Sequence, residues 1–231
     1  MSLGPAHHGY YYQDVLTGIA LVDLLLGKAD VVTVDTKEFG TDRFDDVNIT
    51  HPEGTRLRLQ IKHTTQDREL AHETFSQDGR NLKLDQLLNS LLTDLGTHPD
   101  TTYRIVVRDT HPDADLSVAL KPVDPATQLP DPLPGITTAK YQFDPDALRA
   151  NQPWTGLVSH LDDDALRLAC DHLVVDTNAP ASTIDFAAPG PAERALMRRV
   201  KDELGVGSPP NTDVTPEAAA AALVLPAHGS R

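Results

Sequence analysis

The stretch "RLRLQIKH", residues 56–63, alternates apolar and polar side chains along its whole length. Successive side chains of a strand leave on opposite faces, so this pattern predicts a strand whose one face is apolar, made of Leu57, Leu59 and Ile61. The other face carries two guanidinium groups, an amide and an amine, from Arg56, Arg58, Gln60 and Lys62. What these polar groups do on one strand is the main question that the sequence raises.

The segments around this strand predict an α/β layer fold with a mixed central sheet flanked by helices. Pro52 and Gly54 mark a turn, which places residues 56–63 in a hairpin with the strand before them. Helical spacing of apolar residues and Gly at the ends predict the helices. In chain order the expected elements are a helix, three strands, a helix and a strand, at 9–27, 30–35, 43–50, 56–63, 82–96 and 101–107.

The second half of the chain has a different character. Six prolines between residues 109 and 135 disfavour regular structure over much of that span. A mainly helical C-terminal half is expected after it, with helices at 144–152, 161–175 and 190–206, and "STIDF" (182–186) as a candidate strand. We expect one domain over 1–205, with a core at 9–107, a Pro-rich loop at 109–135 and a helical part at 136–205. Residues 206–231 are expected to be a linker or tail, whose alanine run favours a helix, leading to a further C-terminal domain.

Composition limits the classes of function. A single cysteine, Cys170, excludes an internal disulfide framework and a multi-cysteine zinc site, and it fits a reducing cytosol. No leader pattern and no apolar run of about 20 residues stands in the sequence, so a cytoplasmic protein without membrane association is expected. The net charge of -14 argues against a general nucleic-acid coat protein. It leaves room for a nucleic-acid enzyme that gathers its positive charges in one cleft.

The predicted hairpin answers part of the opening question. In an antiparallel pair the start of one strand lies beside the end of the other, so Asp46 should meet Gln60 and Lys62 at one end of the sheet. Carboxylate and carbonyl oxygens suit Mg²⁺, and the backbone carbonyl of Ile61 offers a further ligand. A lysine close to such a cation can stabilise charge on a phosphate. Asp45 is a rival for the ligand role of Asp46.

The pattern "FDDV…LQIKH", preceded by a helix that opens "GYYYQD", resembles the PD-(D/E)xK nuclease superfamily in its Mrr-like branch, where glutamine stands in the motif. The resemblance covers residues 9–107. This segment is similar to the N-terminal double-stranded DNA endonuclease domains of bacterial antiphage effectors, in which the nuclease domain is attached to a cyclic-nucleotide sensor or a STAND NTPase. It implies a restriction-endonuclease-like fold, with Asp46 and Gln60 as metal-binding residues and Lys62 as the catalytic lysine.

The same resemblance implies the partners. It predicts Mg²⁺ as cofactor, replaceable by Mn²⁺, double-stranded DNA as substrate, homo-oligomerisation on activation, and a sensor or NTPase domain beyond residue 231. Gln13 stands where related enzymes place an acid or amide on the first helix. A catalytically silent module that oligomerises or holds DNA is the alternative function, because Gln60 is not an acid.

For several residues the sequence leaves more than one role open. Arg56 and Arg58 either reach DNA phosphates or pair with the many acids of the chain. Asp35 and Glu38 are further acids that could add a ligand. The three tyrosines at 10–12 could stack on DNA, although packing of one or two rings is favoured. His63 is interpreted as structural, since it points away from Lys62.

Overall fold

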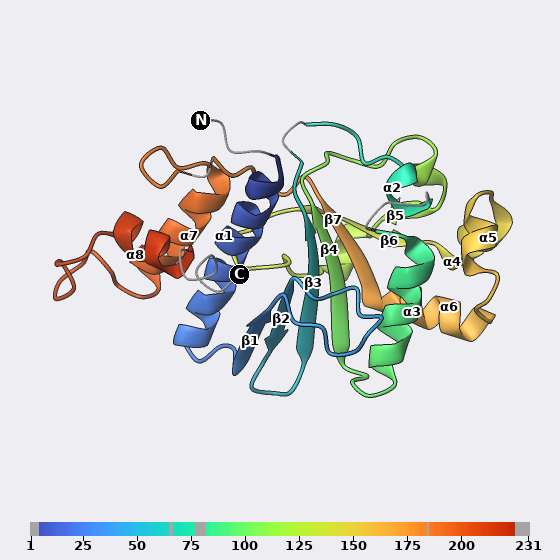
Figure 1. The fold of residues 1–231 in the computed structure, drawn as a ribbon, viewed down its shortest axis with the longest axis horizontal. Coiled ribbons are helices and arrows are strands. Elements are labelled where there is room, and N and C mark those ends of the chain that lie inside the picture. The colour runs from blue at the N-terminus through green and yellow to red at the C-terminus, as the bar shows by residue number, and fades with distance from the viewer. Residues whose placement is uncertain (1–4, 65–66, 77–81, 184, 225–231) are drawn as a thin grey trace.

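The computed structural model describes residues 5–64, 67–76, 82–183 and 185–224, and within them a mixed seven-stranded sheet separates two layers of helices (Figure 1). The sheet order is β1-β2-β3-β4-β7-β6-β5. The strands are β1 (Val31–Val34), β2 (Val47–Thr50), β3 (Arg56–Lys62), β4 (Thr101–Val107), β5 (Leu120–Pro122), β6 (Ala139–Phe143) and β7 (Leu173–Thr177).

β3 lies inside the sheet and joins its two kinds of pairing. It pairs antiparallel with β2, as the turn at 51–55 predicts, and parallel with β4. The crossover from β3 to β4 contains the helix α3 (Leu84–Leu95), in keeping with the long connection that a parallel pair needs. β7 adds a third parallel strand, and β6 and β5 close that side antiparallel.

One face of the sheet is covered by α1 (Pro5–Leu25), α7 (Pro191–Asp202) and α8 (Pro216–Val224). The other face is covered by α3 together with α4 (Pro145–Ala150), α5 (Trp154–Val158) and α6 (Asp163–His172). A short helix, α2 (Glu73–Ser76), and two 3-10 turns (Leu116–Val118 and Pro125–Thr127) complete the described elements. Each layer encloses its own apolar core against the sheet.

α1 is buried on nearly all sides along its middle, because the sheet covers one side and α7 and α8 cover another. Gly18 permits this close packing, since a Cβ there would lie 2.9 Å from a methyl carbon of Leu196 on α7. Ala220 and Val224 of α8 are also buried in this layer. Residues 216–224, which the sequence assigned to a linker or tail, therefore form a helix that packs on the body of the protein.

The prediction of a mainly helical C-terminal half is not confirmed. β5 lies inside the Pro-rich span, and β6 was not predicted at all. The helix expected over 161–175 ends at His172, and its last residues begin the buried strand β7. The candidate strand at 182–186 has no strand among its described residues, and its residue 184 lies outside them.

Within the described residues, no helix combines the length and the apolar composition that crossing a bilayer requires.

Candidate functional site

The site lies where β3 continues past the end of β2. Val34 pairs with Val47, and Val47 pairs with Leu59. The next row across the three strands therefore holds Asp35, Asp46 and Gln60. The predicted meeting of Asp46 with Gln60 is confirmed, because the Gln60 amide donates a hydrogen bond to Asp46 Oδ2.

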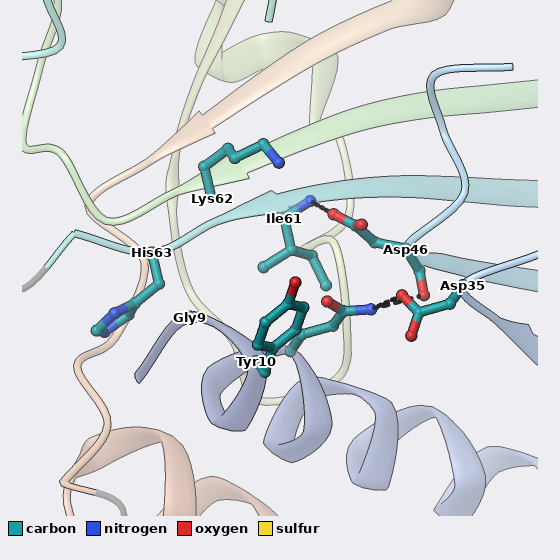
Figure 2. A pocket seen from close by; sticks show the side chains of 8 residues that line it. Gly9, Tyr10, Asp35, Asp46, Ile61, Lys62 and His63 are labelled. Carbon is teal, nitrogen blue, oxygen red and sulfur yellow. Dashed lines mark hydrogen bonds between the residues drawn. The ribbon is translucent and has the colours of Figure 1, made fainter. Parts of the chain in front are cut away.

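The backbone of β3 orients the Asp46 carboxylate. The Ile61 backbone N–H donates to the same Oδ2 atom, at 2.6 Å (Figure 2). A strand residue directs its N–H and its C=O to the same edge, so the Ile61 carbonyl also points to the edge that β2 no longer covers. Within the described residues, Asp46 Oδ1 accepts no hydrogen bond, and it is not among the buried side-chain atoms that lack a partner. One carboxylate oxygen is thus held, and the other is available to a ligand.

A cavity of about 390 Å³ opens beside this carboxylate. Figure 2 shows Lys62 and Ile61 leaving β3 on opposite sides, with Asp46 beside them. Within the part of the chain that the structure describes, the Lys62 ammonium makes no hydrogen bond or ion pair, although its charge acts on Asp46. The residues lining the cavity are Gly9, Tyr10, Gln13, Asp35, Asp46, Ile61, Lys62 and His63.

Gln13 brings α1 into the site. Its amide nitrogen donates to Asp35 Oδ1 at 2.7 Å and to the backbone carbonyl of Asp46 at 3.3 Å. Both hydrogens of the amide are thereby used, and Oε1 is the atom left to accept a bond or a ligand. The supporting position predicted for Gln13 on the first helix is therefore one where it contacts both acids of the row.

Burial raises the pKa of the Asp46 carboxyl to about 6, since the charged form loses hydration. The Lys62 charge and the bonds from Ile61 and Gln60 lower the pKa, and the nearby charge of Asp45 raises it. A buried carboxylate with a raised pKa beside a cavity is an arrangement found often at functional sites. A cation bound at Oδ1 would favour the charged form.

The donor set fits a hard divalent cation. Asp46 offers Oδ1, and Ile61 offers its backbone carbonyl. Gln60 directs its amide nitrogen to Asp46 Oδ2 and is not among the residues that line the cavity, so its amide oxygen would reach a cation there only after the side chain turned and gave up that bond. Two groups of three acidic or histidine side chains elsewhere among the described residues could also hold an ion, and they lie outside this cavity. These groups are Glu38 with Asp94 and His98, and His72 with Glu73 and Asp113.

The Arg58 side chain does not reach the surface of the protein. Its guanidinium is fully buried and pairs with Asp42 and with Asp94, at 2.8 Å for the second pair. It also donates to Asn48 and to the backbone carbonyl of Phe44. Of its two readings, pairing with acids is the observed one, and the DNA-binding assignment of Arg58 is wrong because the side chain is enclosed under α3.

Arg56 pairs with Glu38 and contacts Asp94 at 3.4 Å. It stands six residues before Lys62 on β3, which corresponds to roughly 20 Å along the strand. Arg56 is therefore also bound by acids and lies at the far end of β3 from the cavity, so the structure does not bring it to the site with Lys62.

The remaining candidate residues differ in whether they line the cavity. Asp45 does not line the cavity, and its carboxylate lies 4.0 Å from the Lys37 ammonium, so of these two neighbouring acids Asp46 is the one at the cavity. Tyr12 is buried, with its ring 4.6 Å from that of His63. Tyr10 is 49 % exposed and lines the cavity. The sequence interpretation of His63 as structural missed that it also lines the cavity, although its place directly after the motif was a usable signal.

No protein-family model matches this chain, and no curated protein matches it.

Proposed function

We propose that this protein is a metal-dependent endonuclease of the PD-(D/E)xK type that hydrolyses phosphodiester bonds in double-stranded DNA. The observation that carries the proposal is the end of β3, where Asp46 keeps one oxygen available beside Gln60, Ile61 and the ammonium of Lys62. The choice of double-stranded DNA, and of an antiphage effector as the biological setting, comes from the sequence resemblance.

The roles of the residues follow from their positions. Asp46, Gln60 and Ile61 would hold Mg²⁺ through their oxygen atoms. When bound, Mg²⁺ would supply Lewis acidity to the scissile phosphate and lower the pKa of a water molecule. Lys62 would place its ammonium against the phosphate, where added negative charge develops as the water oxygen bonds to phosphorus.

The cavity supports a phosphate group at this place. Lys62 lines it, and among the described residues its ammonium makes no direct ion pair, although its charge acts on Asp46. Tyr10 stands exposed at the same cavity and can contact a sugar or base. A cation bound by the acids of this cavity, together with the Lys62 ammonium, would give the cavity the positive charge that attracts a phosphate.

Incubation of the purified protein with supercoiled plasmid tests this function. Nicked or linear DNA is expected with Mg²⁺ or Mn²⁺ and none with EDTA. Single-stranded DNA and RNA of the same length serve as competing substrates and should be cut more slowly. Cutting that survives chelation would contradict a metal-dependent mechanism.

A catalytically silent module remains the second candidate, because the motif position 60 carries a neutral amide. The two candidates differ in metal binding. A silent module should bind neither Mg²⁺ nor Mn²⁺ in calorimetry, whereas the nuclease should bind at least one of them and lose that binding in Asp46→Ala.

A further inference from the structure

Asp35 has an unusual backbone for a residue at the end of a strand. Its φ is +49°, in the left-handed region that few residues other than glycine occupy. The backbone N–H groups of Asp35 and of Thr36 both donate toward β2, to the carbonyls of Asp46 and Asp45. In a regular strand, successive N–H groups point to opposite edges. The chain therefore leaves β1 with a local twist at Asp35, and such strained residues cluster at functional sites.

With this backbone conformation, Asp35 lines the cavity. Oδ1 accepts the 2.7 Å hydrogen bond from Gln13 that Figure 2 draws, and the residue lines the same cavity as Asp46. Gln13 fixes the position, because its one amide nitrogen contacts both Asp35 and the backbone of Asp46. The orientation of Asp35 is thus set from a helix that comes from another part of the fold.

This arrangement opposes two acids across a strand pair. Asp35 follows Val34 and Asp46 precedes Val47, so the two acids occupy opposite positions just beyond the last pair of β1 and β2, where like charges destabilise a sheet. The chain carries a net charge of -14, which adds to this cost. A shared cation between the two carboxylates would convert the repulsion into attraction.

We propose that Asp35 supplies the second carboxylate of the cation site, the charge that an acid at position 60 would otherwise provide. This inference rests on the proposed function, since it concerns the same cation. It assigns to β1 a ligand that the strand motif of β3 lacks. Asp35, Asp46 and Gln60 then form one row of ligands across three neighbouring strands, and Gln13 is the positioning residue that holds Asp35 toward the other two.

Mn²⁺ titration by calorimetry of the full 231-residue chain at pH 8 tests the proposal. Asp35→Asn is the informative variant, because asparagine tolerates a positive φ and can still accept the bond from Gln13. Its affinity for Mn²⁺ should fall by about 10- to 100-fold. Asp30→Asn is the matched control, since it removes the same charge just before β1, at the opposite end from Asp35, and should leave the affinity unchanged.

A rescue variant separates the charge from the fold. Adding Gln60→Glu to Asp35→Asn restores one carboxylate to the row, and most of the lost affinity should return. Wild-type affinity in Asp35→Asn, with binding lost in Asp46→Asn, would overturn the role of Asp35 and leave the proposed function standing. Absence of Mn²⁺ binding by the wild type would overturn both. Loss of affinity that Gln60→Glu does not restore would also overturn it, because the effect would then be structural.

Discussion

The backbone nitrogen of Ile61 lies 2.6 Å from Asp46 Oδ2, and this bond joins the end of β3 to the residue just before β2. β3 is longer than its partner β2, so its final residues have backbone groups that no strand covers on that edge. Asp46 fills that position with a side chain in place of a strand. The same geometry that ends the ladder therefore orients a carboxylate toward the cavity.

Asp46→Asn should stabilise the protein without metal at pH 8. Burial raises the pKa of Asp46 to about 6, above its usual value near 4, so the folded state binds more protons than the unfolded state between these values. Stability of the wild type consequently falls as pH rises from about 4 to 6 and stays reduced above that. Thermal unfolding in EDTA should show a higher Tm for the variant at pH 8.

The difference between the two proteins should shrink as the pH falls toward 4, because wild-type Asp46 is then protonated when folded. A variant that is less stable than the wild type at pH 8, or equally altered at both pH values, would contradict the burial of a charged carboxylate at this place.

Lys62→Ala should separate catalysis from metal binding. The ammonium is expected to act on the phosphate and not to hold the cation, so cleavage should fall by roughly 10²- to 10³-fold while Mn²⁺ affinity is kept. Plasmid cleavage and Mn²⁺ calorimetry on the same preparation measure the two effects. Lys121→Ala, an exposed lysine on the far strand β5, is the control and should cut like the wild type. Full activity in Lys62→Ala would exclude this role.

Arg58→Met should destabilise the fold strongly. The guanidinium is fully buried between Asp42 and Asp94, and its removal leaves two buried acids without their partner. A loss of about 3–5 kcal/mol in the free energy of unfolding is expected in urea. Arg167→Met breaks an exposed pair with Asp146 and should cost less than about 1 kcal/mol. Equal losses in the two variants would contradict a structural role for Arg58.

Arg58 also shows where the sequence stops being informative. Alternation along 56–63 correctly predicts the strand, its hairpin and the meeting of Asp46 with Gln60, because these depend on local period and on antiparallel geometry. The alternation does not distinguish a solvent-exposed polar face from a buried one. That difference depends on α3, whose Asp94 arrives from 36 residues further along the chain.

The same reasoning explains β6 and Asp35. β6 has only five residues and lies between Pro134-Gly135 and Asp144-Pro145, so it looks like part of an irregular Pro-rich stretch, and β7 directly follows α6 with no turn residue between them. Asp35 looks like an ordinary polar residue at a strand end. Its place in the cavity follows from the positive φ and from Gln13 on α1, and neither is visible in a local pattern.

Clustering should increase activity. A net charge of -14 disfavours encounter with DNA, and salt screens such repulsion only beyond roughly 8–10 Å. Several copies held together would raise the effective concentration of sites on one duplex. Fusion to an inducible dimeriser should increase plasmid nicking per protomer on addition of the inducer. Equal rates with and without inducer, at matched protomer concentration and in several geometries, would contradict the effect of clustering and leave the catalytic assignment untouched.

The most direct test of the central claim compares wild type with Asp46→Asn, both as forced dimers, in a supercoiled-plasmid nicking assay with Mg²⁺. The variant keeps the size of the side chain and an oxygen that can accept the bond from Ile61, and it removes the negative charge. We predict nicking by the wild type, its loss in EDTA, and background activity in Asp46→Asn. Nicking by Asp46→Asn at the wild-type rate would contradict the assignment of this row of residues as a metal-dependent nuclease site.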